Sequence, residues 1–324
     1  MILAGDIGGT KTHLGLFAGP SEEPVRLATY RSADYEDLSD LVADFLSVDR
    51  VDVRYACVAV AASIADGKGR GVNLPWPVDG QELADHLQIR GVRVINDLEA
   101  NAHGIAGLGP ADFAVLNEGD PGAAGNAAVI SAGTGLGEAG LYWDGKRHHP
   151  FASEGGHTDF APRSDLEAAL FGQMELEFGH VSYERVCSGM GLANIYRFLG
   201  GPDAEPAAIA QAALDRSEER ASWALDLLVS IYGAEAGNLA LKLMATGGIY
   251  VGGGVAPKIL PKLKDGAFMR AFVDKGRFRR LLERIPVRVI LNEKAALLGA
   301  ARCATAALAD VEAAADRLTL VRSR

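Results

Sequence analysis

A glycine-rich turn close to the first residue carries groups that can bind phosphate. Gly8 and Gly9 have no side chains, so their backbone amides can approach a bulky anion closely, and Thr10 adds a hydroxyl donor. Asp6 precedes the turn and can hold a phosphate-bound Mg²⁺ directly or through water. Residues 5–12 miss the P-loop pattern at one position, because Thr10 stands where that pattern needs glycine. The alternative is a tight hairpin with a polar corner and no ligand.

A second glycine bend repeats these features at residues 131–137. Gly133, Thr134 and Gly135 lie at its centre. The segment fails the dinucleotide-binding pattern, because Glu138 occupies the place of the last glycine and no helix is expected to follow. Two such bends that face each other across a cleft can bind one phosphate chain from both sides.

A third glycine cluster, at residues 246–255, contains Gly253 and Gly254. Its glycines would let a planar base or a ribose lie close to the backbone. The alternative is a crowded crossing of a strand and a helix. The presence of the other two bends favours the nucleotide interpretation.

A candidate catalytic base follows an apolar strand. Asn96 and Asp97 stand between the strand expected at 92–95 and the next helix, and capping of that helix explains one of the two. The other polar group then lies at the carboxyl end of a strand, where open α/β sheets bind their ligands. A carboxylate there can accept a hydroxyl proton as the hydroxyl attacks phosphorus, so Asp97 is our candidate base.

A compact polar segment is suited to binding adjacent hydroxyl groups. Glu154 and His157 flank two glycines, and such a group fills a core poorly. A lone histidine is more often structural, and a metal site would need more His or Cys at ligand spacing. We expect His148 and His149 in a charged, exposed turn. Glu184 by itself is interpreted as a surface acid paired with a neighbouring base.

The elements that must position these groups are predicted as two similar α/β halves. After Lys11 the chain alternates with the period of a strand, so the first glycine turn joins two strands. The first half is expected to have this hairpin at 2–17, strands at 25–31, 53–61 and 92–95, and helices at 35–47, 81–87 and 98–108. The second half is expected to have strands at 113–116, 127–131, 136–143, 248–251 and 287–291, a helical insertion at 165–245, a helix from Pro257 and a last helix from Glu293.

Composition limits the class of protein. A chain of 324 residues is long enough for two domains, and 48% hydrophobic with 23% charged residues is typical of a soluble globular protein. The net charge of −10 argues against general binding to nucleic acid or anionic membranes. Three widely spaced cysteines without a C-x-x-C pair indicate neither a zinc site nor a disulfide framework. With no signal-peptide pattern and no membrane-spanning apolar run, a cytoplasmic protein is expected.

Six segments together resemble the bacterial ATP-dependent glucokinases, which have the hexokinase, actin and heat-shock-chaperone ATPase fold. They are DIGGT at 6–10, IND at 95–97, SAGTGLG at 131–137, EGGHTDFAP at 154–162, GHVSYERVCSG at 179–189 and GGIYVGGGV at 247–255. The EGGH and HVSxER segments are the most specific. The resemblance implies an α/β protein of two domains with an actin-like (ribonuclease H-like) ATPase fold and an interdomain cleft. The small domain would comprise 1–107 with 295–324, and the large domain 108–294.

The resemblance also implies a reaction and a site. The reaction is phosphoryl transfer from MgATP to the 6-hydroxyl of glucose, the first step of glycolysis, and the family is commonly homodimeric. Asp97 would be the base. Glucose would be held by Asn96, Asp97, Glu154, His157 and Glu184; the ATP phosphates and Mg²⁺ by Asp6, Gly8, Gly9, Thr10, Lys11, Thr12, Gly133, Thr134 and Gly135; and the adenosine side by Gly253 and Gly254.

One departure points to a related group. Many glucokinases have asparagine where Lys11 stands, and GGTKT is the form usual in the ROK sugar kinases and repressors. The cysteine-rich zinc motif of that group is missing, since only Cys187 lies near the required region. The helix-turn-helix that precedes the first strand of the repressors is not expected either. Both absences favour the glucokinase interpretation.

Three alternatives remain open from the sequence. A kinase for fructose or mannose would use the same machinery. A non-catalytic sugar sensor or regulator would show a lost base or a broken phosphate loop, and Asp97 and the loop glycines are in place. An actin-like or chaperone ATPase would not need the EGGH segment and would hydrolyse ATP without sugar.

Overall fold

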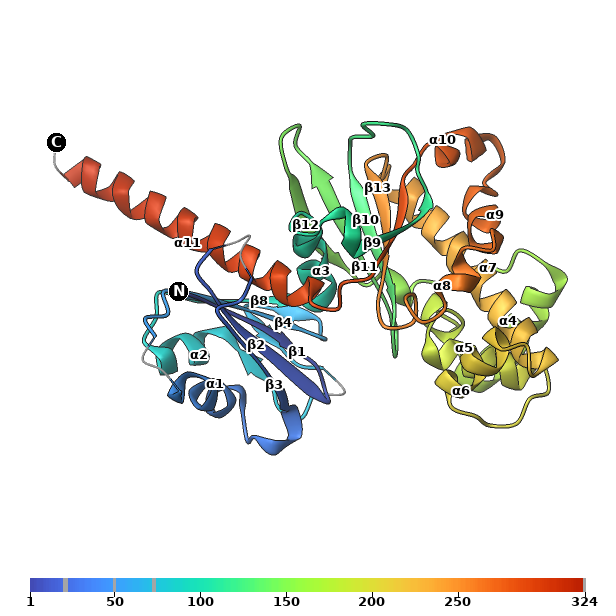
Figure 1. The fold of residues 1–324 in the computed structure, drawn as a ribbon, viewed down its shortest axis with the longest axis horizontal. Helices are drawn as coiled ribbons and strands as arrows, with labels where there is room; N and C mark the ends of the chain where they lie inside the picture. The colour runs from blue at the N-terminus through green and yellow to red at the C-terminus, as the bar shows by residue number, and fades with distance from the viewer. Residues whose placement is uncertain (20–22, 49–50, 72–73, 323–324) are drawn as a thin grey trace. The chain divides into compact units, whose positions relative to one another are not determined.

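The chain folds into two compact units. The computed structural model describes residues 1–19, 23–48, 51–71 and 74–322. Unit 1 comprises Met1–Leu108 with Lys294–Arg324, and unit 2 comprises Gly109–Glu293. Each unit has its own mixed sheet, so the prediction of an α/β protein is confirmed (Figure 1).

Unit 1 is built on a five-stranded sheet in the order β3-β2-β1-β4-β8. Its strands are β1 (Ile2–Ile7), β2 (Lys11–Phe17), β3 (Arg26–Arg31), β4 (Tyr55–Val60) and β8 (Val92–Asn96). The first three form an antiparallel meander, while β1, β4 and β8 run parallel. The predicted hairpin is therefore confirmed, and the carboxyl ends of three parallel strands meet at one edge.

Helices cover both faces of this sheet. The apolar side chains of α1 (Leu38–Ser47) and α2 (Gly80–Leu87) form one core with β1, β2 and β4. On the other face, α11 (Ala295–Arg322) packs on the sheet together with α3 (Asp97–Ile105). The two helices cross closely at Gly299, where any side chain would overlap the carbonyl of Ala100.

Two features of unit 1 differ from the sequence predictions. A small three-stranded sheet of β5 (Ile64–Ala65), β6 (Lys68–Gly69) and β7 (Val78–Asp79) was not expected, because strands of two residues have no readable period. The first helix begins at Leu38 and not at 35, since a short turn, η1 (Ser32–Asp34), precedes it and Asp37 caps it. The Asp37 carboxylate accepts a bond of 2.9 Å from the Asp40 amide.

Unit 2 is built on a six-stranded sheet in the order β12-β11-β10-β13-β14-β9. The strands are β9 (Phe113–Asn117), β10 (Ala127–Ala132), β11 (Leu136–Trp143), β12 (His148–Ser153), β13 (Gly248–Gly252) and β14 (Val287–Ile290). The first and last residues of the predicted strands agree with these within one residue. As in unit 1, an antiparallel hairpin, β10–β11, is followed by parallel pairing, here of β10 with β13.

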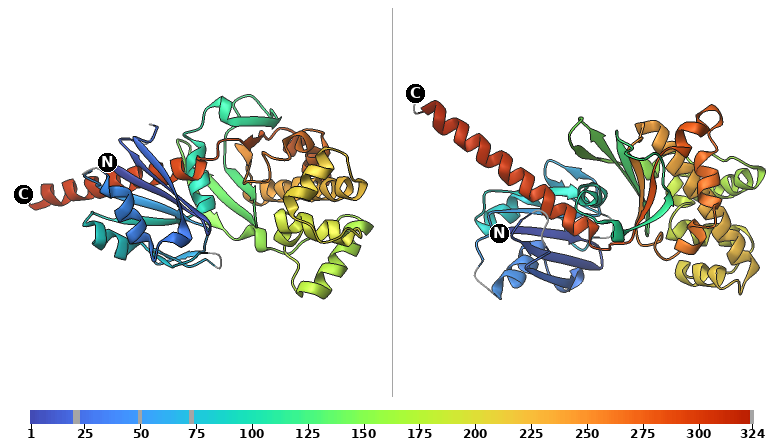
Figure 2. Two further views of the ribbon diagram at one scale, coloured as in Figure 1. Left: turned by 60° about the horizontal axis from the view of Figure 1, so that its bottom comes forward. Right: turned by 45° about the horizontal axis from the view of Figure 1, so that its top comes forward.

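The helices of unit 2 gather on one side of this sheet (Figure 2). They are α4 (Asp165–Phe178), α5 (Gly189–Phe198), α6 (Pro206–Leu214), α7 (Glu219–Leu243), α8 (Leu260–Leu263), α9 (Ala267–Val273) and α10 (Arg279–Glu283), with the short turns η2 (Pro110–Asp112), η3 (Gly155–His157), η4 (Tyr183–Arg185) and η5 (Gly276–Phe278). The long helix α7 is buried at its centre. There the Tyr232 hydroxyl accepts a bond of 3.1 Å from the Ala132 amide at the end of β10.

The prediction of an exposed turn at His148 and His149 is wrong. Both residues belong to the edge strand β12 and are half-buried, with His149 opposite Tyr142 of β11. The turn lies just before them, where the Asp144 carboxylate accepts bonds from two backbone amides and one from the His149 ring at 2.7 Å. These donors hold the pKa of Asp144 well below its usual range.

Among the described residues, no helix is long and apolar enough to cross a membrane.

Candidate active site

The first glycine turn is held in shape by a serine from a distant part of the chain. The β1–β2 register pairs Ile7 with Thr12, and Gly8 donates a bond of 2.9 Å to the carbonyl of Lys11. Ser32 donates its hydroxyl to the Gly8 carbonyl at 2.7 Å, and its amide donates to the Thr10 carbonyl at 3.1 Å. Sequence reasoning missed Ser32, because nothing local links it to a turn that precedes it by more than twenty residues.

The side chains of the turn differ in exposure. Thr10 and Lys11 are exposed, and Gly8 and Gly9 are half-buried. Thr12 is fully buried, and its hydroxyl lies 3.0 Å from the Ser32 hydroxyl. The structure therefore gives Thr12 a supporting contact beneath the turn.

Asp6 offers a single, mostly buried carboxylate beside this turn. Burial raises its pKa, and the charge of His13, its cross-strand neighbour, opposes that shift. Among the described residues, no group of three or more His, Cys, Asp and Glu side chains is placed to hold a metal ion. One carboxylate fits Mg²⁺, which usually keeps several waters and binds substrate phosphates in place of a protein cage.

Asn96 and Asp97 lie at the same sheet edge as the first glycine turn. Val60 of β4 is in register with Ile7 on one side and with Asn96 on the other. With strands about 4.8 Å apart, the two groups are separated by roughly 10 Å across this edge.

The structure decides which of the two residues caps the helix. The Asn96 side chain accepts from the amides of Leu98 and Glu99 at 2.8 and 3.4 Å, and its amide group donates to the Ala62 carbonyl at 3.1 Å. Asp97 is the first residue of α3, where the helix end favours a carboxylate. Its Oδ1 accepts a bond of 3.0 Å from the Leu98 amide. Asn96 is thus the cap of α3.

In unit 2 the second glycine bend is anchored on Glu184. The Oε2 atom of Glu184 accepts a bond of 3.1 Å from the Leu136 amide, and a side chain at Gly135 would overlap this carboxylate. Gly133 accepts a bond of 2.8 Å from the Gly189 amide, and Thr134 is exposed. The interpretation of Glu184 as a surface acid paired with a base is wrong, because its partner is a backbone amide of the bend itself.

The acid–histidine segment folds as a single turn, η3, beside Glu184. The amide of His157 donates to the Glu154 carbonyl at 3.0 Å, and both side chains are exposed. A side chain at Gly156 would overlap the carbonyl of Leu136, the residue whose amide Glu184 binds. The structure therefore brings Glu154, His157 and Glu184 to one region of unit 2.

The third glycine cluster lies against the end of β10. The amide of Val255 donates a bond of 3.0 Å to the Ala132 carbonyl. Gly253 has a φ of +80°, and a side chain there would overlap the same carbonyl. Gly253 and Gly254 are exposed and sit next to the bend that begins at Gly133. The expected phosphate and adenosine segments of unit 2 are thus neighbours.

The candidate residues form two groups, one in each unit. Unit 1 carries Asp6, the turn at 8–11, Thr12, Asn96 and Asp97, and unit 2 carries the other candidates. Sequence reasoning gave Glu138 no role beyond breaking a pattern, although it is buried under η3. Its signal was available, since it is a charged residue within an otherwise apolar strand.

Comparisons with known proteins agree on one family. The family model described as "Glucokinase" matches residues 3–307. A glucokinase of Synechocystis sp. is 43% identical, over 93% of this chain and 97% of the relative. The crystal structure of a glucokinase from an Antarctic psychrotroph has a TM-score of 0.83 and 31% identity, with 94% of this chain and 98% of that chain covered.

A more distant structure shares the fold alone. It is a ROK family glucokinase from Streptomyces griseus in complex with glucose and AMPPNP, with a TM-score of 0.64, 20% identity, and 94% of this chain and 98% of that chain covered. The chain therefore belongs to the glucokinase family, and it is an ATP-dependent hexose kinase with the actin-like ATPase fold.

Proposed function

We propose that this kinase transfers the γ-phosphoryl group of MgATP to the 6-hydroxyl of glucose, giving glucose 6-phosphate. The observation that carries the proposal is the placement of Asp97 at the sheet edge that also bears the first glycine turn. A base and a phosphate-binding turn at one edge are what an in-line attack by a hydroxyl on phosphorus requires.

Asp97 acts as the base that takes the proton of the attacking hydroxyl. Its backbone position is fixed by the first turn of α3, and the Asn101 side chain donates to its carbonyl at 3.0 Å. Because Asn96 already caps the helix, the carboxylate of Asp97 is not required for that purpose. The proton transfer at this position contributes about 10²-fold or more to the rate.

The phosphate chain is held by backbone amides of the two glycine bends. The turn at 8–11 and the bend at 133–135 each present short backbone segments with threonine hydroxyls exposed at Thr10 and Thr134. Lys11 adds a cation at the first turn, and Asp6 is the residue that would hold Mg²⁺ there. A bound Mg²⁺ would neutralise charge that develops on the transferring group. Gly253 and Gly254 line the adenosine side.

Glucose hydroxyls are bound by Asn96, Glu154, His157 and Glu184. The bond from the Leu136 amide fixes the orientation of the Glu184 carboxylate before sugar arrives, so little ordering is needed on binding. Carboxylates and amides bind vicinal hydroxyls in pairs, which supplies both affinity and orientation. This assignment is supported by the exposure of Glu154 and His157 on one turn next to Glu184.

We further infer that the two units are the small and large domains of the kinase. The proposal also includes a role in the first step of glycolysis, a cytoplasmic location and a homodimeric state. The match of the glucokinase family model to residues 3–307 is what supports these last points.

A coupled assay of ADP release from MgATP tests the proposal, with glucose, fructose, mannose or no sugar. We expect fast release with glucose only. Faster release with fructose or mannose would show that this hexose, and not glucose, is the substrate. Release at the same rate without sugar would indicate an ATPase, and no release under any condition would indicate a sensor.

A further inference from the structure

A buried acid lies directly beneath the turn that carries Glu154 and His157. Glu138 of β11 is 1% exposed, and its Oε1 atom has no hydrogen-bond partner among the described residues. A side chain at Gly155 would overlap its Oε2 atom, so the turn rests on this carboxyl group. The backbone of Glu138 supports the turn as well, because Ser153 donates to its carbonyl at 3.2 Å and accepts from the Gly155 amide at 3.1 Å.

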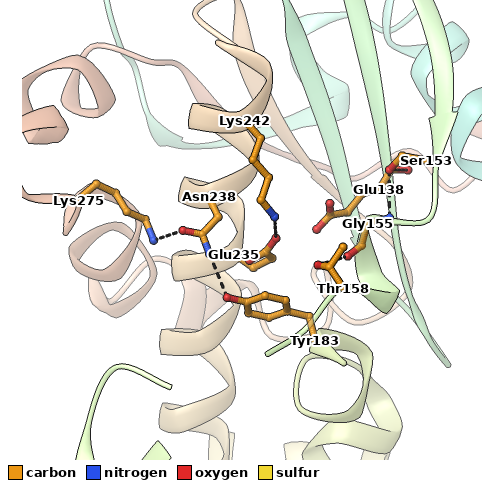
Figure 3. Close-up of polar contacts among 9 residues, drawn as sticks. All are labelled: Glu138, Ser153, Gly155, Thr158, Tyr183, Glu235, Asn238, Lys242 and Lys275. Atoms are coloured by element: carbon orange, nitrogen blue, oxygen red, sulfur yellow. Dashed lines mark hydrogen bonds and ion pairs between the residues drawn. The ribbon is translucent and has the colours of Figure 1, made fainter. Parts of the chain in front are cut away.

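The carboxyl of Glu138 faces a second buried acid on α7. Glu235 is fully buried, and Figure 3 shows its carboxylate pointing toward that of Glu138. Glu235 accepts bonds from Lys242 at 3.0 Å and from Asn238 at 2.7 Å. Two ionised carboxylates cannot share a hydrogen bond, but a protonated one can donate to an ionised one.

Glu138 is the less well stabilised carboxylate of this pair. Glu235 has a cation and an amide donor to stabilise its charge, whereas Oε1 of Glu138 has neither. Burial and the charge of Glu235 raise the pKa of Glu138 to about 8, and Lys242 opposes that shift. The other titratable groups that interact with Glu138 are the buried Cys187 and Tyr232, whose pKa values are also raised and which stay neutral.

The same helix also holds the other side of the turn. Asn238 donates to the Tyr183 hydroxyl at 3.0 Å and accepts from Lys275 at 2.6 Å (Figure 3). The amide of Tyr183 donates to the Thr158 carbonyl at 3.0 Å, and Thr158 donates its hydroxyl to the Gly155 carbonyl at 2.7 Å. Tyr183 directly precedes Glu184, so α7 supports both segments of the proposed sugar site.

We propose that Glu138 is a positioning residue which, in its protonated form, donates to Glu235 and holds the sugar-binding turn in place. This inference rests on the sugar-binding role proposed above for Glu154 and His157. Loss of the proton sets two like charges against each other in a buried site, and the carboxyl that carries Gly155 must then move. Glucose affinity therefore falls as Glu138 ionises.

The test measures glucose dissociation constants of the intact chain by calorimetry, without ATP, at pH 7 and pH 9. Because the protonated fraction of Glu138 falls about tenfold between these values, wild-type affinity should fall by up to about tenfold. Glu138→Gln keeps the shape of the neutral acid and should bind as wild type does at pH 7, with less than about a twofold change at pH 9. Glu138→Ala should bind weakly at both values. Glu175→Gln, an exposed acid on α4, is the matched control and should follow wild type.

A second measurement reports the proton without glucose. The infrared band of a protonated carboxyl group should be present in wild type at pH 7, lost at pH 9 and absent in Glu138→Gln. A wild-type pH dependence of glucose affinity in Glu138→Gln, or no such band at pH 7, overturns the inference while the proposed function stands. Absence of glucose binding at both pH values overturns the proposed function and the positioning role with it.

Discussion

Replacement of Asp97 by asparagine separates the chemical step from binding in this kinase. The substitution removes the carboxylate base but keeps the shape of the side chain, and the amide oxygen can still accept the 3.0 Å bond from the Leu98 amide. The cap of α3 is unaffected, because Asn96 provides it. The thermal unfolding midpoint should therefore stay close to that of wild type.

The expected kinetic effect follows from the loss of a single proton acceptor. General-base catalysis contributes roughly 10²–10⁴-fold, which corresponds to about 2.7–5.5 kcal/mol of transition-state stabilisation. We expect kcat to fall by this factor, while the glucose dissociation constant changes by less than about threefold. A fall in kcat at constant affinity is the pattern of an interaction made only in the transition state.

The assay is ADP release with saturating glucose and MgATP, together with calorimetric glucose binding. Asp85→Asn is the matched control, since it makes the same charge change on α2 of the same unit, at an exposed residue. It should leave both quantities unchanged. A kcat for Asp97→Asn within about threefold of wild type would refute the assignment of the base.

Three further predictions concern the supports of the two glycine bends and the metal. Ser32→Ala leaves the Gly8 carbonyl without its donor and the buried Thr12 hydroxyl without its acceptor. We therefore expect a loss of about 1–3 kcal/mol in unfolding free energy and a raised KM for ATP, and Ser47→Ala, at an exposed helix end, should show neither. In Gly135→Ala the new methyl group would displace the Glu184 carboxylate, and glucose binding measured by calorimetry should weaken about tenfold or more. Gly172→Ala is the control, because Gly172 has free space around it, and it should leave glucose binding unchanged. Because burial raises the pKa of Asp6 and Mg²⁺ needs its ionised form, the Mg²⁺ concentration for half-maximal activity should rise as pH falls; an unchanged requirement would contradict the metal role.

Local signals in the sequence predicted most of the strands and all three glycine bends. The hairpin at Gly8 and Gly9 follows from strand alternation after Lys11, and the strand at β10 from a short continuous apolar run. These signals are local, because periodicity and glycine conformational freedom act within a few residues.

The strand at His148 was missed because it does not have the pattern of a buried strand. β12 lies at the edge of its sheet, where proline is tolerated, and Pro150 stands in its middle. Because an edge strand is partly exposed to solvent, it also tolerates polar residues such as these histidines. Only the pairing with β11 identifies it as a strand.

The supports of the site depend on contacts between residues far apart in the chain. Ser32 holds a turn that comes before it, and Glu138 meets an acid on α7 that lies nearly a hundred residues later. A sequence pattern finds residues whose chemistry faces solvent or substrate, because those stand out as polar groups at strand ends. Buried partners stand out only as polar groups in apolar surroundings, and such a group must find a hydrogen bond within the fold. A charged residue within a predicted core strand is therefore itself a signal: it predicts a buried partner, and in this chain the partner of Glu138 lies behind the sugar-binding turn.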